Sequence, residues 1–270
     1  MTRQLFFTTA LFAVVSAAQD GTPDKLTIPF RDASRPGTVR VSLQQGAITV
    51  KGHSGKDVLV EAVARRGRKE SSEPAEASGM KRIYSTATAL SAEEENNVVR
   101  ISTRSFSQPV DLVIQVPLKT SLKLTGMNNG AITVENVEGD IEVSHMNGTV
   151  TLTDVSGSAV AHSMNGAIHA VLKRVDASKP MSFSSMNGKI DVTFPADLKA
   201  DLKIRTERGE VYSDFDVAVA ANAPKVEESK DGKGRYRVTT DSSMNAKVNG
   251  GGQEISFKSM NGSIYIRKAK

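Results

Sequence analysis

The strongest pattern in this sequence is an alternation of apolar and polar residues that restarts after a glycine every nine residues between positions 130 and 171. An alternation with a period of two places the apolar residues on one side of a β-strand. The pattern therefore predicts short strands joined by tight corners. The glycines are Gly130, Gly139, Gly148, Gly157 and Gly166, and the inward-facing residues two and four positions after them are Ile132, Val134, Ile141, Val143, Val150, Leu152, Ala159, Ala161, Ile168 and Ala170.

Two kinds of corner alternate, so the true repeat is 18 residues. One kind carries valine two positions before the glycine, and the other carries methionine in the motif Met-Asn-Gly. We interpret the motif as structural, because Asn and Gly adopt left-handed backbone conformations easily and methionine can fill the inside of a bend. The alternative is an exposed array of asparagines that binds a ligand. The complete motifs are Met146, Asn147, Gly148; Met164, Asn165, Gly166; Met186, Asn187, Gly188; and Met260, Asn261, Gly262, with looser copies at 127–130 and 244–246.

An internal repeat of this length, with a short strand on each side, is typical of a β-solenoid in which each coil stacks on the last. We predict an all-β, parallel β-helix-like solenoid with two short strands per coil of about 18 residues and Asn-Gly corners. Regular coils are expected over 126–270, with a loop at 214–236. A less regular β region over 19–125, with a polar insertion at 65–82, is expected to join the same continuous domain over 26–268.

The first 18 residues have the features of a secretory signal peptide. Arg3 supplies the positive charge, positions 5–15 are apolar, and Ser16-Ala17-Ala18 is a small-residue cleavage site. An N-terminal anchor helix is the alternative. No later stretch reaches the roughly 20 apolar residues of a membrane span. We therefore expect an exported protein, periplasmic or at the cell surface, with no integral membrane span after removal of the signal.

Composition excludes several kinds of chemistry. The chain has no cysteine, so disulfides, thiolate catalysis and a lipid-modified cysteine are ruled out. Its four histidines fall in different columns of the repeat, which does not favour a metal site. The formal net charge is only +5, and the basic residues near positions 65–82 alternate with glutamates. We therefore expect no cofactor, no metal and no nucleic-acid partner.

Acidic residues gather in two places, at Glu135, Glu138, Asp140 and Glu142, and again at Glu207, Glu210, Asp214 and Asp216. Paired carboxylates in a cleft would indicate a carbohydrate-active β-helix enzyme, whereas charged outward positions also keep a sheet surface soluble. With no tryptophan and 5% aromatic residues, platforms for stacking sugars are scarce. We expect no enzymatic activity. The outward column Thr133, Thr151, His169, Asp191 likewise lacks the threonine at every rung that an ice-binding face needs.

Several motifs in order resemble a bacterial family known as the putative adhesin domain. They are the strand, Val-Pro-Leu and strand over 110–124, the Asn-Gly coils from Met127 onward, Phe194-Pro195 with the strand over 202–211, and the closing Gly-Gly-Gly and Met-Asn-Gly-Ser-Ile-Tyr-Ile. The resemblance covers residues 38–268. It implies an exported or membrane-linked β-solenoid of otherwise unknown function, and it brings no catalytic residues.

Three functions follow as hypotheses. The first is a non-enzymatic envelope or surface protein that binds another surface or a polysaccharide through its β faces, where many weak contacts act together. The second is an envelope scaffold that binds a partner protein through protruding loops or an exposed end strand. The third is the carbohydrate-active enzyme.

Overall fold

The regular elements of this protein are all β-strands in the part of the chain that the structure describes. The computed structural model describes residues 23–65, 88–103, 108–128, 130–219, 226–230, 236–240 and 243–270. Within those ranges no helix has the length and hydropathy of a membrane span. The expected signal peptide and almost all of the polar insertion at 65–82 lie outside the described residues.

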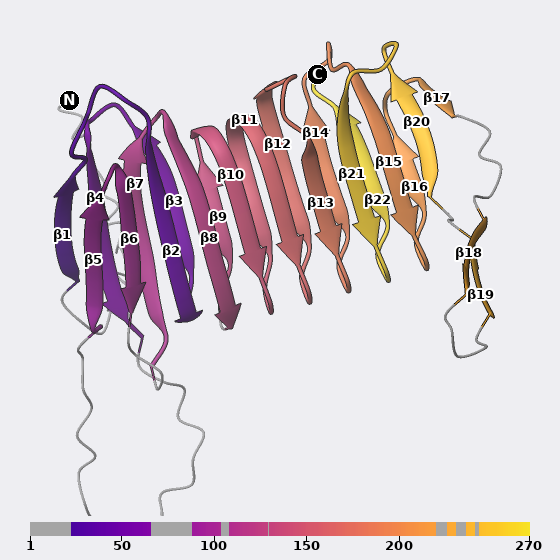
Figure 1. The fold of residues 1–270 in the computed structure, drawn as a ribbon. Coiled ribbons are helices and arrows are strands. Elements are labelled where there is room, and N and C mark those ends of the chain that lie inside the picture. Colours follow the sequence, from indigo (N-terminus) through magenta and orange to yellow (C-terminus); the bar gives the residue numbers. More distant parts are fainter. Residues whose placement is uncertain are drawn as a thin grey trace, which may run out of the picture.

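Twenty of the described strands form one continuous sheet, which folds over into two facing layers and gives the long row of strands in Figure 1. The first layer contains, in order along the row, β5 (Leu90–Glu95), β6 (Val98–Thr103), β2 (Gly37–Gln45), β8 (Thr120–Asn128), β10 (Glu138–His145), the second half of β11 (Val150–Ser163), β13 (Met181–Ser185), β21 (Gln253–Ser259), β15 (Ala200–Thr206), β20 (Met244–Val248) and β17 (Val217–Val219).

The second layer faces the first and contains, in the same direction, β1 (Asp24–Pro29), β4 (Asp57–Ala64), β7 (Val110–Pro117), β3 (Ile48–His53), β9 (Ile132–Glu135), the first half of β11, β12 (Ile168–Val175), β14 (Ile190–Phe194), β22 (Ile264–Lys268) and β16 (Val211–Ser213). Because β11 bends from one layer into the other, both layers belong to one sheet.

The core lies between the layers, and it is built from the alternating residues that the sequence singled out. All ten apolar residues expected to face inward between positions 132 and 170 are at most 2% exposed. In the regular part, neighbouring rungs are 18 residues apart, as in the pairing of Glu138 with Ser156. The expected all-β, solenoid-like fold is confirmed.

The stacking order, however, does not follow the sequence. The coil of β2 and β3 lies between the coil of β6 and β7 and the coil of β8 and β9. The last coil, β21 and β22, lies between the coil of β13 and β14 and the coil of β15 and β16. Figure 1 accordingly places the C-terminus within the row of strands. The prediction that each coil stacks on the last is therefore wrong at both ends of the chain.

The segment 214–236 is also more structured than the expected loop. It contains β17, which pairs antiparallel with β20, and β18 (Val226–Lys230), which forms a hairpin with β19 (Tyr236–Thr240). Figure 1 shows this hairpin beside the end of the row. The strand pattern of residues 226–230 is short and interrupted by charge, which is why the sequence did not reveal it.

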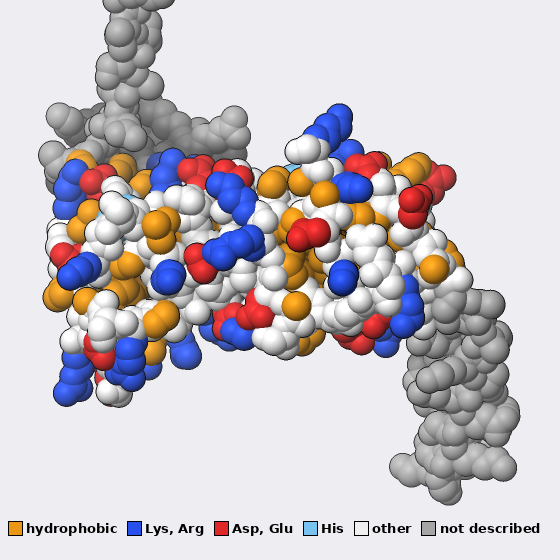
Figure 2. All heavy atoms as spheres, turned by 90° about the horizontal axis from the view of Figure 1, so that it is seen from above, with side chains coloured by type: hydrophobic (Ala, Val, Ile, Leu, Met, Phe, Trp, Pro, Cys, Tyr) orange, Lys and Arg blue, Asp and Glu red, His pale blue; other side chains and the backbone are white. Residues whose placement is uncertain are grey.

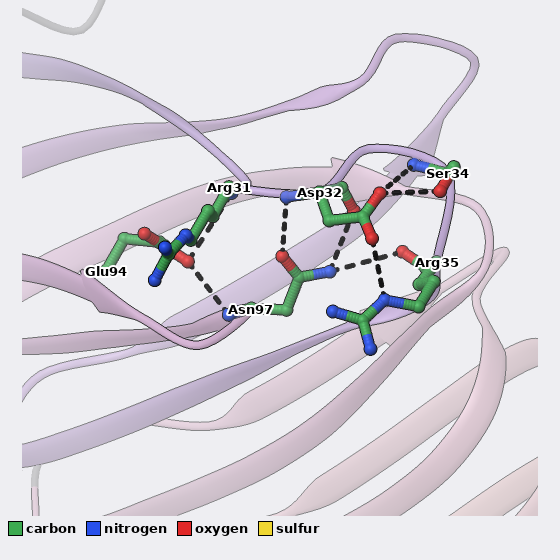
Figure 3. A network of polar contacts seen from close by, with 6 residues as sticks. All are labelled: Arg31, Asp32, Ser34, Arg35, Glu94 and Asn97. Atoms are coloured by element: carbon green, nitrogen blue, oxygen red, sulfur yellow. Dashed lines mark hydrogen bonds and ion pairs between the residues drawn. The ribbon is translucent and has the colours of Figure 1, made fainter.

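At the other end of the row, a polar network holds the loop before β2 against the β5–β6 turn (Figure 3). The Asn97 side chain accepts a hydrogen bond from the Asp32 amide and donates one to the Asp32 carbonyl, both at 2.8 Å. The Asp32 carboxylate in turn accepts from the Ser34 amide and from Arg35. The Ser34 hydroxyl also donates to this carboxylate and is the largest cause that lowers the pKa of Asp32, to about 2, followed by the Ser34 amide and Arg35.

Candidate functional site

The four Met-Asn-Gly motifs lie in one column along a single edge of the solenoid, where strands of the first layer end and those of the second begin. We call this the Met-Asn-Gly edge. A Cβ atom on Gly166 would lie 2.0 Å from the carbonyl oxygen of Gly148, and one on Gly188 would lie 2.1 Å from that of Gly166. The glycines are therefore needed because successive rungs approach too closely for a side chain.

The expected reason for Asn and Gly, a left-handed backbone, is wrong at this edge. None of the complete Met-Asn-Gly motifs contains a residue with positive φ, whereas the opposite edge contains Asn136 at 55° and Asp154 at 58°. The tighter reversal of the chain thus occurs at the valine corners. There, Asn and Asp accept the left-handed conformation at low cost.

The asparagines of the edge form a continuous hydrogen-bonded ladder. Each side-chain NH2 group donates to the side-chain oxygen of the asparagine on the rung before it. The donor–acceptor distances are 2.5, 2.7, 2.7 and 2.6 Å along the series Asn128, Asn147, Asn165, Asn187 and Asn261. Stacked amides of this kind stabilise parallel, in-register strands. One polar contact of each asparagine is therefore made within the protein.

The methionines point outward, contrary to the prediction that they fill the inside of the bend. Met146, Met164, Met186 and Met260 are 38, 37, 40 and 41% exposed. The strand alternation explains this, because the residue before each methionine is the one that faces inward. Met244, expected at a looser copy of the corner, instead lies within β20 opposite Ile204.

Beneath the methionines lies a buried column of small polar residues that the sequence analysis did not identify. Ser163 and Ser185 donate to the carbonyl oxygens of Gly148 and Gly166, at 3.1 and 3.0 Å. His145 occupies the same column and is 1% exposed. Its ring fits because the neighbouring position on β8 is Gly126, which has no side chain. Burial lowers the pKa of His145, and the Gly130 backbone opposes this shift.

The histidines and carboxylates of the described residues form no group of three that could hold a metal ion. His162 hydrogen-bonds to Ser184, and His53 to the Asp57 carbonyl. Three acidic residues expected to cluster are instead paired with bases one or two rungs away. These ion pairs are Glu135 with Lys51, Glu138 with Arg174, and Glu142 with Lys123. Figure 2 shows charges of both signs intermingled along the molecule.

A polar groove of about 520 Å³ lies at the opposite edge, over Gly139 and Gly157. Its Asp140 carboxylate accepts hydrogen bonds from Lys179 at 2.8 Å and from Ser158 at 2.8 Å. The hydrogen bond from Lys179 is the largest cause that lowers the pKa of Asp140, and the same contact raises the pKa of Lys179. The groove thus has its main charges already neutralised.

An exposed aromatic platform lies at the far end of the second layer. Strand register extends the outward column Thr133, Thr151, His169, Asp191 to Tyr265 and Tyr212. The two tyrosine rings stack with centroids 5.1 Å apart and planes within 10°. Tyr212, on the outermost strand β16, is 48% exposed. Residues 212 and 265 become neighbours only because the last coil is inserted, so sequence reasoning missed the pair.

Charged side chains hold this platform in place. Arg267 donates two hydrogen bonds to Asp191, at 2.6 and 3.2 Å, and its guanidinium lies 5.4 Å from the Tyr265 ring centroid. The Tyr212 hydroxyl donates to Glu210, and this contact raises the pKa of Tyr212. We define Asp191, Glu210, Tyr212, Tyr265 and Arg267 as the tyrosine platform. It combines aromatic rings with charged groups, and its outermost ring, Tyr212, is exposed to solvent.

The described strands define an all-β, solenoid-like protein in which one sheet forms both outer faces. The chain belongs to the family described as Toastrack DUF4097, whose model matches residues 27–249. This match confirms the family resemblance drawn from the sequence. No curated protein matches the chain.

Solved structures also resemble this chain at low sequence identity, and two of them are described below. One is described as a putative cell adhesion protein from Clostridium sporogenes, with 11% identity and a TM-score of 0.46, covering 92% of this chain and all of that one. The other is described as a putative adhesin from Bacteroides fragilis, with 14% identity and a TM-score of 0.36, covering 93% of this chain and 99% of that one.

Proposed function

We propose that this protein is an exported, non-enzymatic protein of the cell envelope or cell surface that binds a polysaccharide on another surface through its outer β faces. The observation that carries the proposal is the tyrosine platform. Sugar rings have apolar C–H faces that pack on aromatic rings, and their hydroxyls hydrogen-bond to carboxylates and guanidinium groups. Both kinds of group are present here side by side.

The position of the platform supports the proposal. Strand β16 is hydrogen-bonded to β22 on one side, and no other described strand pairs with it. No described strand of the second layer therefore covers the face of the Tyr212 ring that points away from Tyr265. A sugar residue stacked there would leave the rest of a long polymer free to run along the column of outward residues, where further weak contacts add to the affinity.

Binding can be measured by co-sedimentation of the full chain with insoluble polysaccharides, isolated peptidoglycan and intact cells. Tyr212→Ala should weaken saturable binding about fivefold to tenfold, because stacking on one aromatic ring contributes roughly 1–1.5 kcal/mol. Thr151→Ala, in the same column but several rungs away, is the comparison variant, because it removes at most one of the weak contacts along the column and should lose much less affinity. Equal binding by the tyrosine variant and the native chain, or equal loss in both variants, would contradict the proposal.

A second candidate is an envelope scaffold that recognises a partner protein, and the open edge of β16 favours it. A partner strand could add to this edge through main-chain hydrogen bonds. Such binding would survive Tyr212→Ala, since side chains contribute less to it. Retained binding of a protein partner by a variant that no longer binds polysaccharide would therefore identify the scaffold function.

A further inference from the structure

We propose that the methionines of the Met-Asn-Gly edge form a binding site for soft monovalent metal ions, Cu(I) or Ag(I). The site consists of Met127, Met146, Met164, Met186 and Met260, which we call the methionine row. Backbone hydrogen bonds place these residues on five successive rungs, because the amide of each following asparagine donates to the carbonyl of the methionine one rung before, at 2.8 to 2.9 Å.

The fold itself does not require methionine at this position. On the rung beyond Met127 the equivalent residue is Gln44, since Leu43 pairs with Gly126 and Gln45 with Asn128. On the rung beyond Met260 the equivalent residue is Glu207, since Thr206 pairs with Ser259. Polar residues therefore form the same corner at both ends of the row. The five methionines between them need a different explanation.

Burial does not provide that explanation. The four methionines from Met146 to Met260 leave 37 to 41% of their surface exposed, so much of their hydrophobic stabilisation is not realised. These side chains are accessible to solvent, and a metal ion needs such access for entry. By contrast, Met181 faces the core and is 2% exposed.

The spacing of the row suits a soft metal. Neighbouring rungs are about 4.8 Å apart. Zinc–thiolate bonds are about 2.3 Å long, and with metal–sulfur bonds of similar length two sulfurs on either side of one metal ion would be separated by roughly 4.6 Å. Methionine has flexible torsions that allow adjacent side chains to adjust to this distance. Thioethers are neutral and soft, and they select Cu(I) over hard cations.

The surroundings of the row also favour a soft ion over a hard one. Oxygen ligands for Ca²⁺ or Mg²⁺ would have to come from the adjacent asparagines, whose side-chain oxygens accept hydrogen bonds within the ladder. The chain has no cysteine, so methionine is its sole source of sulfur ligands. Selectivity for Ag(I) and Cu(I) over Zn²⁺ and Ca²⁺ is therefore expected.

The test is a titration of the full chain with Ag(I), and anaerobically with Cu(I) against a colorimetric Cu(I) chelator. The triple variant Met146→Leu, Met164→Leu, Met186→Leu removes the centre of the row and keeps its size and apolar character. It should bind either ion at least tenfold more weakly. Met244→Leu is the control, because Met244 is 42% exposed but lies outside the row.

A second measurement on the native chain does not depend on the folding of a variant. With ¹³C-methyl-labelled methionine, Ag(I) should shift the NMR signals of the row methionines and leave those of Met181 and Met244 in place. The proposal is overturned by unchanged affinity in the triple variant, by equal loss in the Met244 variant, or by shifts spread evenly over all methionines.

Discussion

At the scale of single residues, the inward column beneath the methionines shows how one position can hold different side chains on successive rungs. The column contains Gly126, His145, Ser163, Ser185 and Ser259. The serines are small, and the hydroxyls of Ser163 and Ser185 donate hydrogen bonds to the glycine carbonyls of the corner on the rung before, Gly148 and Gly166. The imidazole of His145 is larger and is accommodated by the adjacent glycine. This histidine is the buried titratable group in the centre of the described stack.

The buried histidine predicts a pH dependence of stability. Because burial lowers the pKa of His145, the unfolded chain binds the proton more readily than the folded chain. The contribution of neutral, buried His145 to the free energy of unfolding is fully present well above the ordinary histidine pKa of about 6.5. This contribution is lost as the pH falls from about 6.5 towards the lower pKa of the folded state. Urea midpoints measured between pH 8 and pH 5 should therefore fall on acidification.

The control for this prediction is His145→Ser, which copies the residue that the chain uses at positions 163 and 185. The variant should show a smaller decrease in the urea midpoint over the same pH range. A slope equal to that of the native chain would assign the pH dependence to other groups.

At the scale of elements, the end of the row formed by β5 and β6 is closed by side-chain contacts rather than by a further coil. The loop before β2 is fixed to the β5–β6 turn by Asn97, which is 8% exposed and has a φ of 64°. Asparagine tolerates this left-handed conformation, and its amide satisfies two backbone groups of Asp32. The conformation and the hydrogen bonds can be separated by mutation.

Asn97→Gly keeps the backbone conformation and removes the hydrogen bonds, so it should lower the free energy of unfolding by roughly 1–3 kcal/mol. Asn97→Ala adds the strain of a left-handed alanine and should cost about 1 kcal/mol more. Denaturant unfolding of the two variants measures both the loss of the hydrogen bonds and the strain of the left-handed alanine. Equal stability of the glycine variant and the native chain would show that the network does not stabilise this end.

The sequence predicts those strands whose position follows from the alternation of apolar and polar residues. Ile132, Val150 and Ile168 face the core as expected, because strand periodicity is a local property. The direction of the methionines was not predicted correctly. Inward residues have odd numbers before the first complete corner (Ile141, Val143, His145) and even numbers after it (Val150, Leu152), so Met146 follows the strand before it and faces outward. The position of the last coil depends on long-range packing. A local signal for it did exist, because Phe183 and Phe257 share one inward position.

The aromatic core explains why the last coil occupies that position. The rings of Phe183 and Phe257 stack at 5.5 Å, and Phe194 packs edge-on against both at 6.2 and 6.3 Å. All three are fully buried. On the rung before them the equivalent position is Ala161, which leaves room for the large rings. The tyrosine platform could not be foreseen without this insertion, and neither could the continuation of the methionine row to Met260.

At the scale of the whole molecule, the inserted coil makes the C-terminal residues part of the interior of the stack. Removal of residues 253–270 would expose Phe183 and Phe194 and would separate β13 from β15. We expect this truncation to unfold the surrounding coils, with complete loss of protection from protease over residues 181–213. In an ordinary solenoid the same deletion would remove an end coil and leave the others folded.

The comparison deletion is residues 23–29, which removes the edge strand β1. This strand pairs with β4 at the end of the stack, so its loss should lower the melting temperature without unfolding the other coils. Limited proteolysis and thermal melts monitored by circular dichroism distinguish the two outcomes. Similar melting temperatures for the two truncated chains would show that the inserted coil does not hold the neighbouring coils together.

The inserted coil also has a consequence for synthesis. A ribosome makes the chain from its N-terminus, so the strands of residues 181–213 emerge well before the coil that must lie between them. The nascent chain cannot complete its stack in the order in which it is made. The coils on either side of the last coil can meet their partner strands only after residues 253–270 have been made, and a polypeptide released before that point has a gap between them.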